Sequence, residues 1–111
     1  MPLELLKGTL DVLVLKTLSW GPLHGYGVSR AIRTATDDLF QVEEGALYPA
    51  LRRLEARGLV EATWGRTDTG REARFYALTD AGTQALATEV RSWDRYVAAM
   101  ARVLDADGPL G

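Results

Sequence analysis

The first half of the chain has apolar residues at helical spacing in three successive segments. The first, Leu3 to Trp20, predicts a mostly buried helix that Gly21-Pro22 ends. The second is shorter and runs out in the polar stretch from Thr34 to Asp38; its apolar stripe consists of Val28, Ala31, Ile32 and Ala35. The third predicts a helix from Glu44 to Arg57 with Leu47, Leu51 and Leu54 on one stripe, and Gly58 follows as its stop. Pro49 lies inside this third helix, and we expect a slight bend there because the carbonyl that loses its donor belongs to Gly45, in the first turn.

From Leu59 onward the spacing of the apolar residues changes from that of helices to that of β-strands. The segments Leu59–Trp64 and Arg74–Leu78 predict two strands, and the polar, glycine-flanked residues 65–71 predict the loop of a β-hairpin. Thr79 is of the residue type that caps a helix N-terminus, with Asp80 favourable in the first turn, and a long helix is expected to about Leu104.

The order helix, helix, helix, hairpin, long helix predicts a mainly α, α+β fold, the winged helix-turn-helix with a two-stranded wing. In that arrangement the third helix enters the major groove of DNA and the wing contacts the flanking backbone. We therefore expect residues 1–79 to form a winged-helix DNA-binding domain, residues 80–104 a C-terminal dimerisation helix, and residues 105–111 a frayed tail.

Composition excludes several classes of function. A chain of 111 residues fits one domain, and with no cysteine and one histidine it has no material for disulfides, Cys-based zinc sites or thiol nucleophiles. No oxyanion donor set, nucleophile elbow or phosphate loop accompanies the acidic pairs Asp37-Asp38 and Glu43-Glu44, so we expect no enzyme activity, no catalytic residues, no metal and no cofactor. With no apolar run long enough for a bilayer and no secretory signal, we expect a cytoplasmic protein without a membrane partner.

The formal net charge of −2 conceals a basic middle segment. Residues 45–76 contain six arginines and four acidic residues, whereas residues 1–44 and 77–111 are each net negative. Phosphate binding depends on a local basic face more than on the total charge, so this middle segment is the candidate for contact with nucleic acid.

Short motifs along the chain resemble the PadR family of bacterial transcriptional regulators. They are Leu6-Lys7-Gly8-Thr9-Leu10, Leu23-His24-Gly25-Tyr26, the run from Glu44 to Leu51, Leu54-Glu55 with Gly58-Leu59, and Tyr76-Ala77-Leu78-Thr79 with Gly82. The resemblance covers about residues 4–100 and implies a homodimeric repressor that binds a palindromic operator and, in some members, is released by a small molecule. Ala46 stands where the family often has threonine or serine, so no operator sequence follows from the resemblance.

The face of the third predicted helix opposite its leucines carries small residues and arginines. These are Gly45, Pro49, Arg52, Arg53 and Ala56, with Ala46 and Tyr48 at the borders. Small residues allow close approach to DNA, and arginine reaches base edges or phosphates. A solvated helix face would look the same in isolation, but the hairpin that follows favours DNA. Tyr48 is expected to pack its ring, to donate its hydroxyl to a phosphate, or to do both.

The hairpin supplies Arg66, Arg71 and Arg74, which we expect to contact the DNA backbone or enter the minor groove. His24 is interpreted as a residue at the start of a helix or a hydrogen-bonded partner. Trp64 is interpreted as a packing residue rather than one that stacks on a base. A winged-helix module used only for protein–protein contacts is the alternative function, because fold alone does not fix function.

The long final helix carries an apolar stripe with coiled-coil spacing: Leu86, Val90, Trp93, Val97, Met100 and Leu104. The stripe either packs on the chain's own core or forms a dimer interface. At 1.5 Å per residue a helix of this size is roughly 37 Å long and exceeds a small core, which favours a second copy of the chain. Some members of the PadR family, which this chain resembles, bind planar molecules through a tryptophan of the final helix. Trp93 with Val97 therefore either lines a pocket for a small aromatic effector or serves only as a packing residue.

Overall fold

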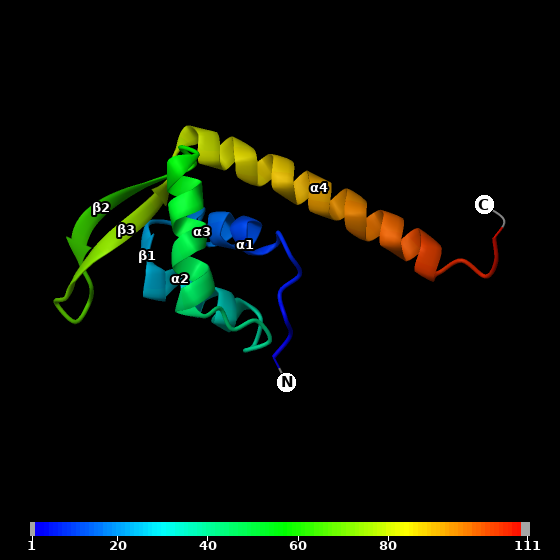
Figure 1. Cartoon of the computed structure of the whole chain (residues 1–111), viewed down its shortest axis with the longest axis horizontal. Helices are drawn as coiled ribbons and strands as arrows, with labels where there is room; N and C mark the ends of the chain where they lie inside the picture. Colours follow the sequence, from blue (N-terminus) through cyan, green and yellow to red (C-terminus); the bar gives the residue numbers. More distant parts are fainter. Residues whose placement is uncertain (1, 110–111) are drawn as a thin grey trace.

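The computed structural model describes residues 2–109. In chain order the elements are α1 (Leu10–Leu18), β1 (Leu23–His24), α2 (Gly25–Ala35), α3 (Glu44–Ala56), β2 (Val60–Arg66), β3 (Glu72–Leu78) and α4 (Asp80–Leu104). The first three helices and the sheet pack together, and α4 extends away from them (Figure 1). This arrangement confirms the mainly α, α+β winged-helix class.

The core lies between α1, α2 and α3 and is closed by the base of the hairpin. The predicted stripe of α3 is buried, with Leu47, Leu51 and Leu54 each at most 1% exposed. Val14 of α1 and Val28 of α2 pack into the same cluster. The helical spacing therefore identified the inward face of α3 correctly and that of α2 at Val28 and Ile32, whereas Ala35, on the same predicted stripe of α2, is exposed.

The first helix is shorter than predicted. It begins at Leu10, with Thr9 at the N-cap, and ends at Leu18, with Ser19 at the C-cap. Gly8 has a φ of +86°, which a right-handed helix does not accommodate. Leu3 and Leu6 precede this break and are exposed, so the helical spacing that they share with Leu10 extends beyond the start of the helix itself.

The sheet has three strands where the sequence predicted two. The two-residue strand β1 pairs with β3, which also pairs with β2, in the order β1-β3-β2. Both wing strands are also longer than predicted: β2 continues to Arg66 and β3 begins at Glu72, which leaves residues 67–71 as the loop. Arg66 is therefore a strand residue and not a loop residue.

The start of α4 is held against the end of α3 and the start of the wing. Thr79 is the N-cap, as predicted: its hydroxyl accepts the Gly82 N–H at 3.0 Å and donates to the Gly58 carbonyl at 2.7 Å. Gly82 packs so closely on the Leu59 carbonyl that a Cβ atom there would overlap it. This junction fixes the direction in which α4 leaves the core.

Beyond its first turns α4 departs from the rest of the molecule. The longest dimension is 60 Å, and the radius of gyration of 16.4 Å exceeds the ~13 Å of a compact chain of similar length. The predicted frayed tail begins with Asp105 at the C-cap; residues up to 109 form a turn and bends, and 110–111 lie outside the described residues. Among residues 2–109, no helix combines the length and apolar character needed to cross a bilayer.

Candidate nucleic-acid interface

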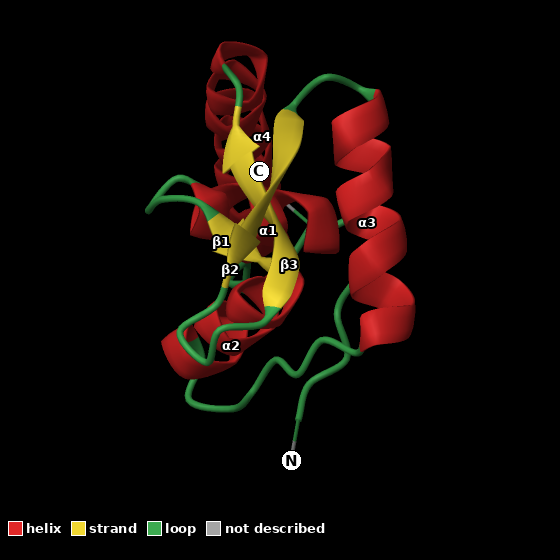
Figure 2. Ribbon diagram, turned by 90° about the vertical axis from the view of Figure 1, so that its left-hand side faces the viewer, coloured by secondary structure: helices red, strands yellow, loops and turns green. Residues whose placement is uncertain are grey.

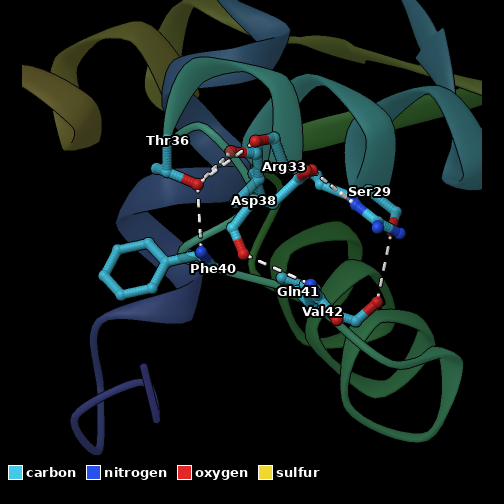
Figure 3. A network of polar contacts seen from close by, with 8 residues as sticks. Ser29, Arg33, Thr36, Asp38, Phe40, Gln41 and Val42 are labelled. Carbon is cyan, nitrogen blue, oxygen red and sulfur yellow. Dashed lines mark hydrogen bonds and ion pairs between the residues drawn. The ribbon is translucent and has the colours of Figure 1, made fainter. Parts of the chain in front are cut away.

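The loop between α2 and α3 sets the position of the third helix (Figure 3). Asp37 and Asp38 have φ values of 49° and 66°, in the left-handed region that aspartate tolerates. The Arg33 Nε donates to Asp38 Oδ1 at 2.7 Å, and the Thr36 hydroxyl accepts the Phe40 N–H at 3.0 Å. Through these contacts the loop is held to the last turns of α2, so that α3 starts at a defined point.

The α3 helix presents its predicted polar face to solvent. Gly45, Ala46, Pro49, Arg52 and Arg53 are all exposed. Figure 2 shows α3 beside the hairpin, and an ion pair between Arg74 Nη2 and Glu55 Oε2, 3.0 Å apart, connects the two elements. Any ligand that approaches the exposed face of α3 therefore meets the wing as well.

Two of the short motifs pack on each other at the edge of this face. The ring and hydroxyl of Tyr48 lie directly over Gly25, so close that a Cβ atom on that glycine would be 2.9 Å from the ring. Tyr48 nevertheless keeps 37% of its surface exposed. A side chain at position 25 would force the Tyr48 ring to shift. One side of this ring packs on Gly25, and the rest is accessible to a ligand.

A groove of about 1190 Å³ runs between α2, the exposed side of α3 and the wing. Arginines from all three parts line it: Arg30, Arg52, Arg66, Arg71 and Arg74. Asp68 and Glu72 are the acidic side chains on the same lining. Five cations against two anions make this groove basic in a chain whose total charge is negative.

Two groove residues were missed by the sequence analysis. Tyr26 and Arg30 lie one turn apart on α2, with the Arg30 guanidinium 5.8 Å from the centre of the Tyr26 ring. The available signal was their i, i+4 spacing on the side of α2 away from its apolar stripe. That they line the same groove as Arg52 depends on the packing of α2 against α3, which the local sequence does not encode.

Several wing and helix arginines already have partners within the chain. Arg66 donates to the Gly70 carbonyl at 3.1 Å and so braces the loop, while Arg74 lies 5.7 Å from the centre of the Tyr76 ring. Arg53 pairs with Asp11 of α1 at 2.8 Å and, within residues 2–109, is not among the groove-lining residues. Arg52 and Arg53, adjacent in sequence, therefore have different surroundings.

His24 and Trp64 have different outcomes. The prediction for His24 is confirmed: it is the N-cap of α2, and its Nδ1 accepts the Gly27 N–H at 2.8 Å. The prediction for Trp64 is wrong: the side chain is 73% exposed and does not pack into the core. The hairpin extends beyond the three-helix core, so Trp64, although it follows an apolar strand pattern, has nothing large to pack against.

Residues 14–88 match the transcriptional regulator PadR-like family. The chain belongs to this family. PadR-like proteins are transcriptional regulators, which confirms the prediction that the chain is not an enzyme.

One curated protein and two solved structures illustrate what the chain is similar to. "Uncharacterized protein X" of Lysinibacillus sphaericus is 30% identical over 90 residues, covering 81% of this chain and 83% of the relative. The crystal structure of a PadR-like transcriptional regulator from Bacillus cereus is similar with a TM-score of 0.77 and 27% identity, covering 91% of this chain and 96% of that one. A PadR family transcriptional regulator from Eggerthella lenta gives a TM-score of 0.77 and 29% identity, covering 91% and 86%.

In this PadR-family chain the apolar stripe of α4 is largely uncovered. Leu86 is buried, but the remaining predicted positions Val90, Trp93, Val97, Met100 and Leu104 are 38–72% exposed. Tyr96 stacks on Trp93 with ring centres 6.1 Å apart. A small apolar hollow of about 270 Å³ lies farther along the helix and is lined by Tyr96, Ala99, Met100, Val103 and Leu104. The stripe thus covers the chain's own core only at its first position.

Proposed function

We propose that this PadR-family regulator is a homodimeric repressor that binds a palindromic DNA operator through α3 and the wing, in the cytoplasm. The observation that carries the proposal is the basic groove between α2, α3 and the wing, with its five arginines. In this proposal residues 1–79 form the DNA-binding domain and residues 80–104 the dimerisation helix.

The exposed face of α3 is suited to the major groove. Gly45, Ala46 and Pro49 keep its N-terminal half free of bulky side chains, so that the helix backbone approaches the base edges closely. Arg52 extends from the same face into the basic groove, and its guanidinium is of the type that makes a bidentate contact with guanine. Tyr48, half packed on Gly25, offers its exposed edge to the backbone.

The wing is suited to the phosphate backbone. Arg66, Arg71 and Arg74 line one side of the groove and place positive charge where the strand flanking the major groove would lie. Arg53 is 56% exposed, and its ion pair with Asp11 is of the weak surface kind, so a phosphate can replace the carboxylate.

The uncovered apolar stripe of α4 supports pairing with a second copy. A large exposed apolar face on a small protein marks an interaction surface, and the spacing of this one matches a coiled-coil seam. A two-fold dimer places its two α3 helices about one DNA turn, roughly 34 Å, apart and so requires an inverted-repeat site. Trp93 and Val97 lie on this face, where a planar aromatic effector would bind and shift the spacing of the two α3 helices.

Salt-dependent binding to duplex DNA tests the proposal. The affinity for a duplex long enough for two half-sites should fall steeply as the salt concentration rises. A plot of the logarithm of the association constant against the logarithm of the salt concentration should have a slope of about −0.9 for each phosphate neutralised. Reversing the charge of groove residues Arg52 and Arg71 should make that slope shallower. A module used only for protein contacts would give no salt-dependent duplex binding, and this result would overturn the proposal.

A further inference from the structure

Trp64 is a large aromatic side chain in an exposed position on the wing. It is 73% exposed, on the edge strand β2 of the three-stranded sheet. Its directly opposite partner on β3 is Arg74, and Arg66 lies two residues farther along β2. Opposite and alternate residues of a hairpin share one face, so Trp64, Arg66 and Arg74 lie on the same side of the wing.

That side of the wing is the one turned toward α3. At the base of the hairpin, the first residue on this side of the wing is Val60, which is 2% exposed and belongs to the core. Farther along, Arg74 on the same face reaches Glu55 of α3 at 3.0 Å. The core ends before Trp64. Its neighbours on this face, Arg66 and Arg74, line the basic groove, and Trp64 lies beside that lining.

We propose that Trp64 contacts the sugar–phosphate backbone of a duplex bound in the groove. The indole would cover the apolar face of a deoxyribose, and its Nε1–H would donate to a neighbouring phosphate oxygen. The chemistry fits because tryptophan combines a large apolar surface with a single donor and no acceptor. Glu72 lies opposite Arg66 on this face and Glu55 pairs with Arg74, but the adjoining groove as a whole carries more arginines than acidic side chains, which favours a polyanion over an apolar or basic protein partner.

This contact rests on the proposed DNA-binding function and adds a residue of a different chemical kind to it. Backbone contacts fix the position of a protein on DNA without reading its sequence. Trp64 therefore contributes to the affinity for every duplex and does not change the preferred operator.

Fluorescence of a chain that keeps only Trp64 tests the placement. The variant Trp20→Phe/Trp93→Phe is titrated with a random-sequence duplex at low salt, while the anisotropy of a label on the DNA reports binding independently. At saturation we expect a clear change in Trp64 emission and at least a twofold fall in its quenching by acrylamide. The matched chain Trp20→Phe/Trp64→Phe, which keeps only Trp93 on α4, should show neither change. Unchanged Trp64 emission and quenching with saturating anisotropy would overturn the inference and leave the proposed function standing.

Affinity measurements test the energetic contribution. Trp64→Ala should weaken binding about tenfold, equally for operator and random duplexes, and Trp64→Phe, which keeps a ring but loses the donor, by about threefold. Thr63→Ala, at the exposed neighbour on the opposite face of the hairpin, serves as the control and should bind normally. Wild-type affinity in both Trp64 variants, with unchanged thermal melting, would overturn the inference. Absence of duplex binding by the unaltered chain would overturn the proposed function as well.

Discussion

A glutamate at Val97 should convert the proposed dimer into monomers. Val97 lies in the middle of the uncovered stripe of α4, between Trp93 and Met100, and is 45% exposed in the single chain. In the proposed dimer this exposed part is covered by the second copy. The substitution thus acts at the centre of the seam, far from α3 and the wing.

The expected size of the effect follows from the exposed fraction. Covering about half of the valine side chain in the dimer contributes roughly 1 kcal/mol per chain to the free energy of dimerisation. The substitution removes this contribution from both chains. A carboxylate held at the seam without a partner costs several kcal/mol more in each chain. A total of about 5 kcal/mol raises the dimer Kd by more than about a thousandfold.

Sedimentation at several protein concentrations measures this change. Thr88→Glu, on the opposite side of the same helix, adds the same charge off the seam and should leave the dimer Kd within about tenfold of the wild-type value. Circular dichroism melting of both variants checks that the helix and the core remain folded. A Val97→Glu chain that dimerises like the Thr88→Glu control would refute the proposed seam.

Three further predictions concern the interface, the junction and the effector. Arg52→Ala should weaken operator binding ten- to a hundredfold, as measured by anisotropy, because a base contact contributes about 1–3 kcal/mol. Arg53→Ala should weaken binding less, because the Arg53 side chain pairs with Asp11 of α1. Equal losses of affinity in the two variants would contradict these different roles of Arg52 and Arg53. Gly82→Ala should destabilise the fold by about 3 kcal/mol in thermal or urea unfolding, because its Cβ overlaps the Leu59 carbonyl, and an unchanged midpoint would contradict the packing. A chain that keeps only Trp93 should be quenched by planar cationic or phenolic compounds, and no quenching across such a panel would argue against an effector site there.

Much of the fold was predictable because local signals agreed with the tertiary structure. The leucines of α3, the glycine after it and the Thr79 cap each specify one element without reference to distant residues. The start of α1 was not predictable from spacing, since Leu6 continues the helical period across Gly8 although the backbone breaks there. Strand β1 has two residues and exists only through its pairing with β3, so no local pattern marks it.

The candidate interface was predictable in its elements and less so in its individual residues. The outward face of α3 follows from helical geometry once the leucines are known to be buried. The different surroundings of Arg52 and Arg53 depend on Asp11, which is 42 residues away from Arg53 in sequence. The exposure of Trp64 depends in turn on how far the hairpin extends past the core.

Selection of bound sequences from a random duplex library tests the central claim most directly. A dimer that reads DNA through two α3 helices should enrich one inverted repeat whose half-site centres lie about one helical turn apart. The same selection with the Arg52→Ala chain should lose or relax the preference at symmetric positions of both half-sites. Enrichment of no sequence, or of a single half-site without its inverted copy, would contradict the proposal that this PadR-family chain binds a palindromic operator as a dimer.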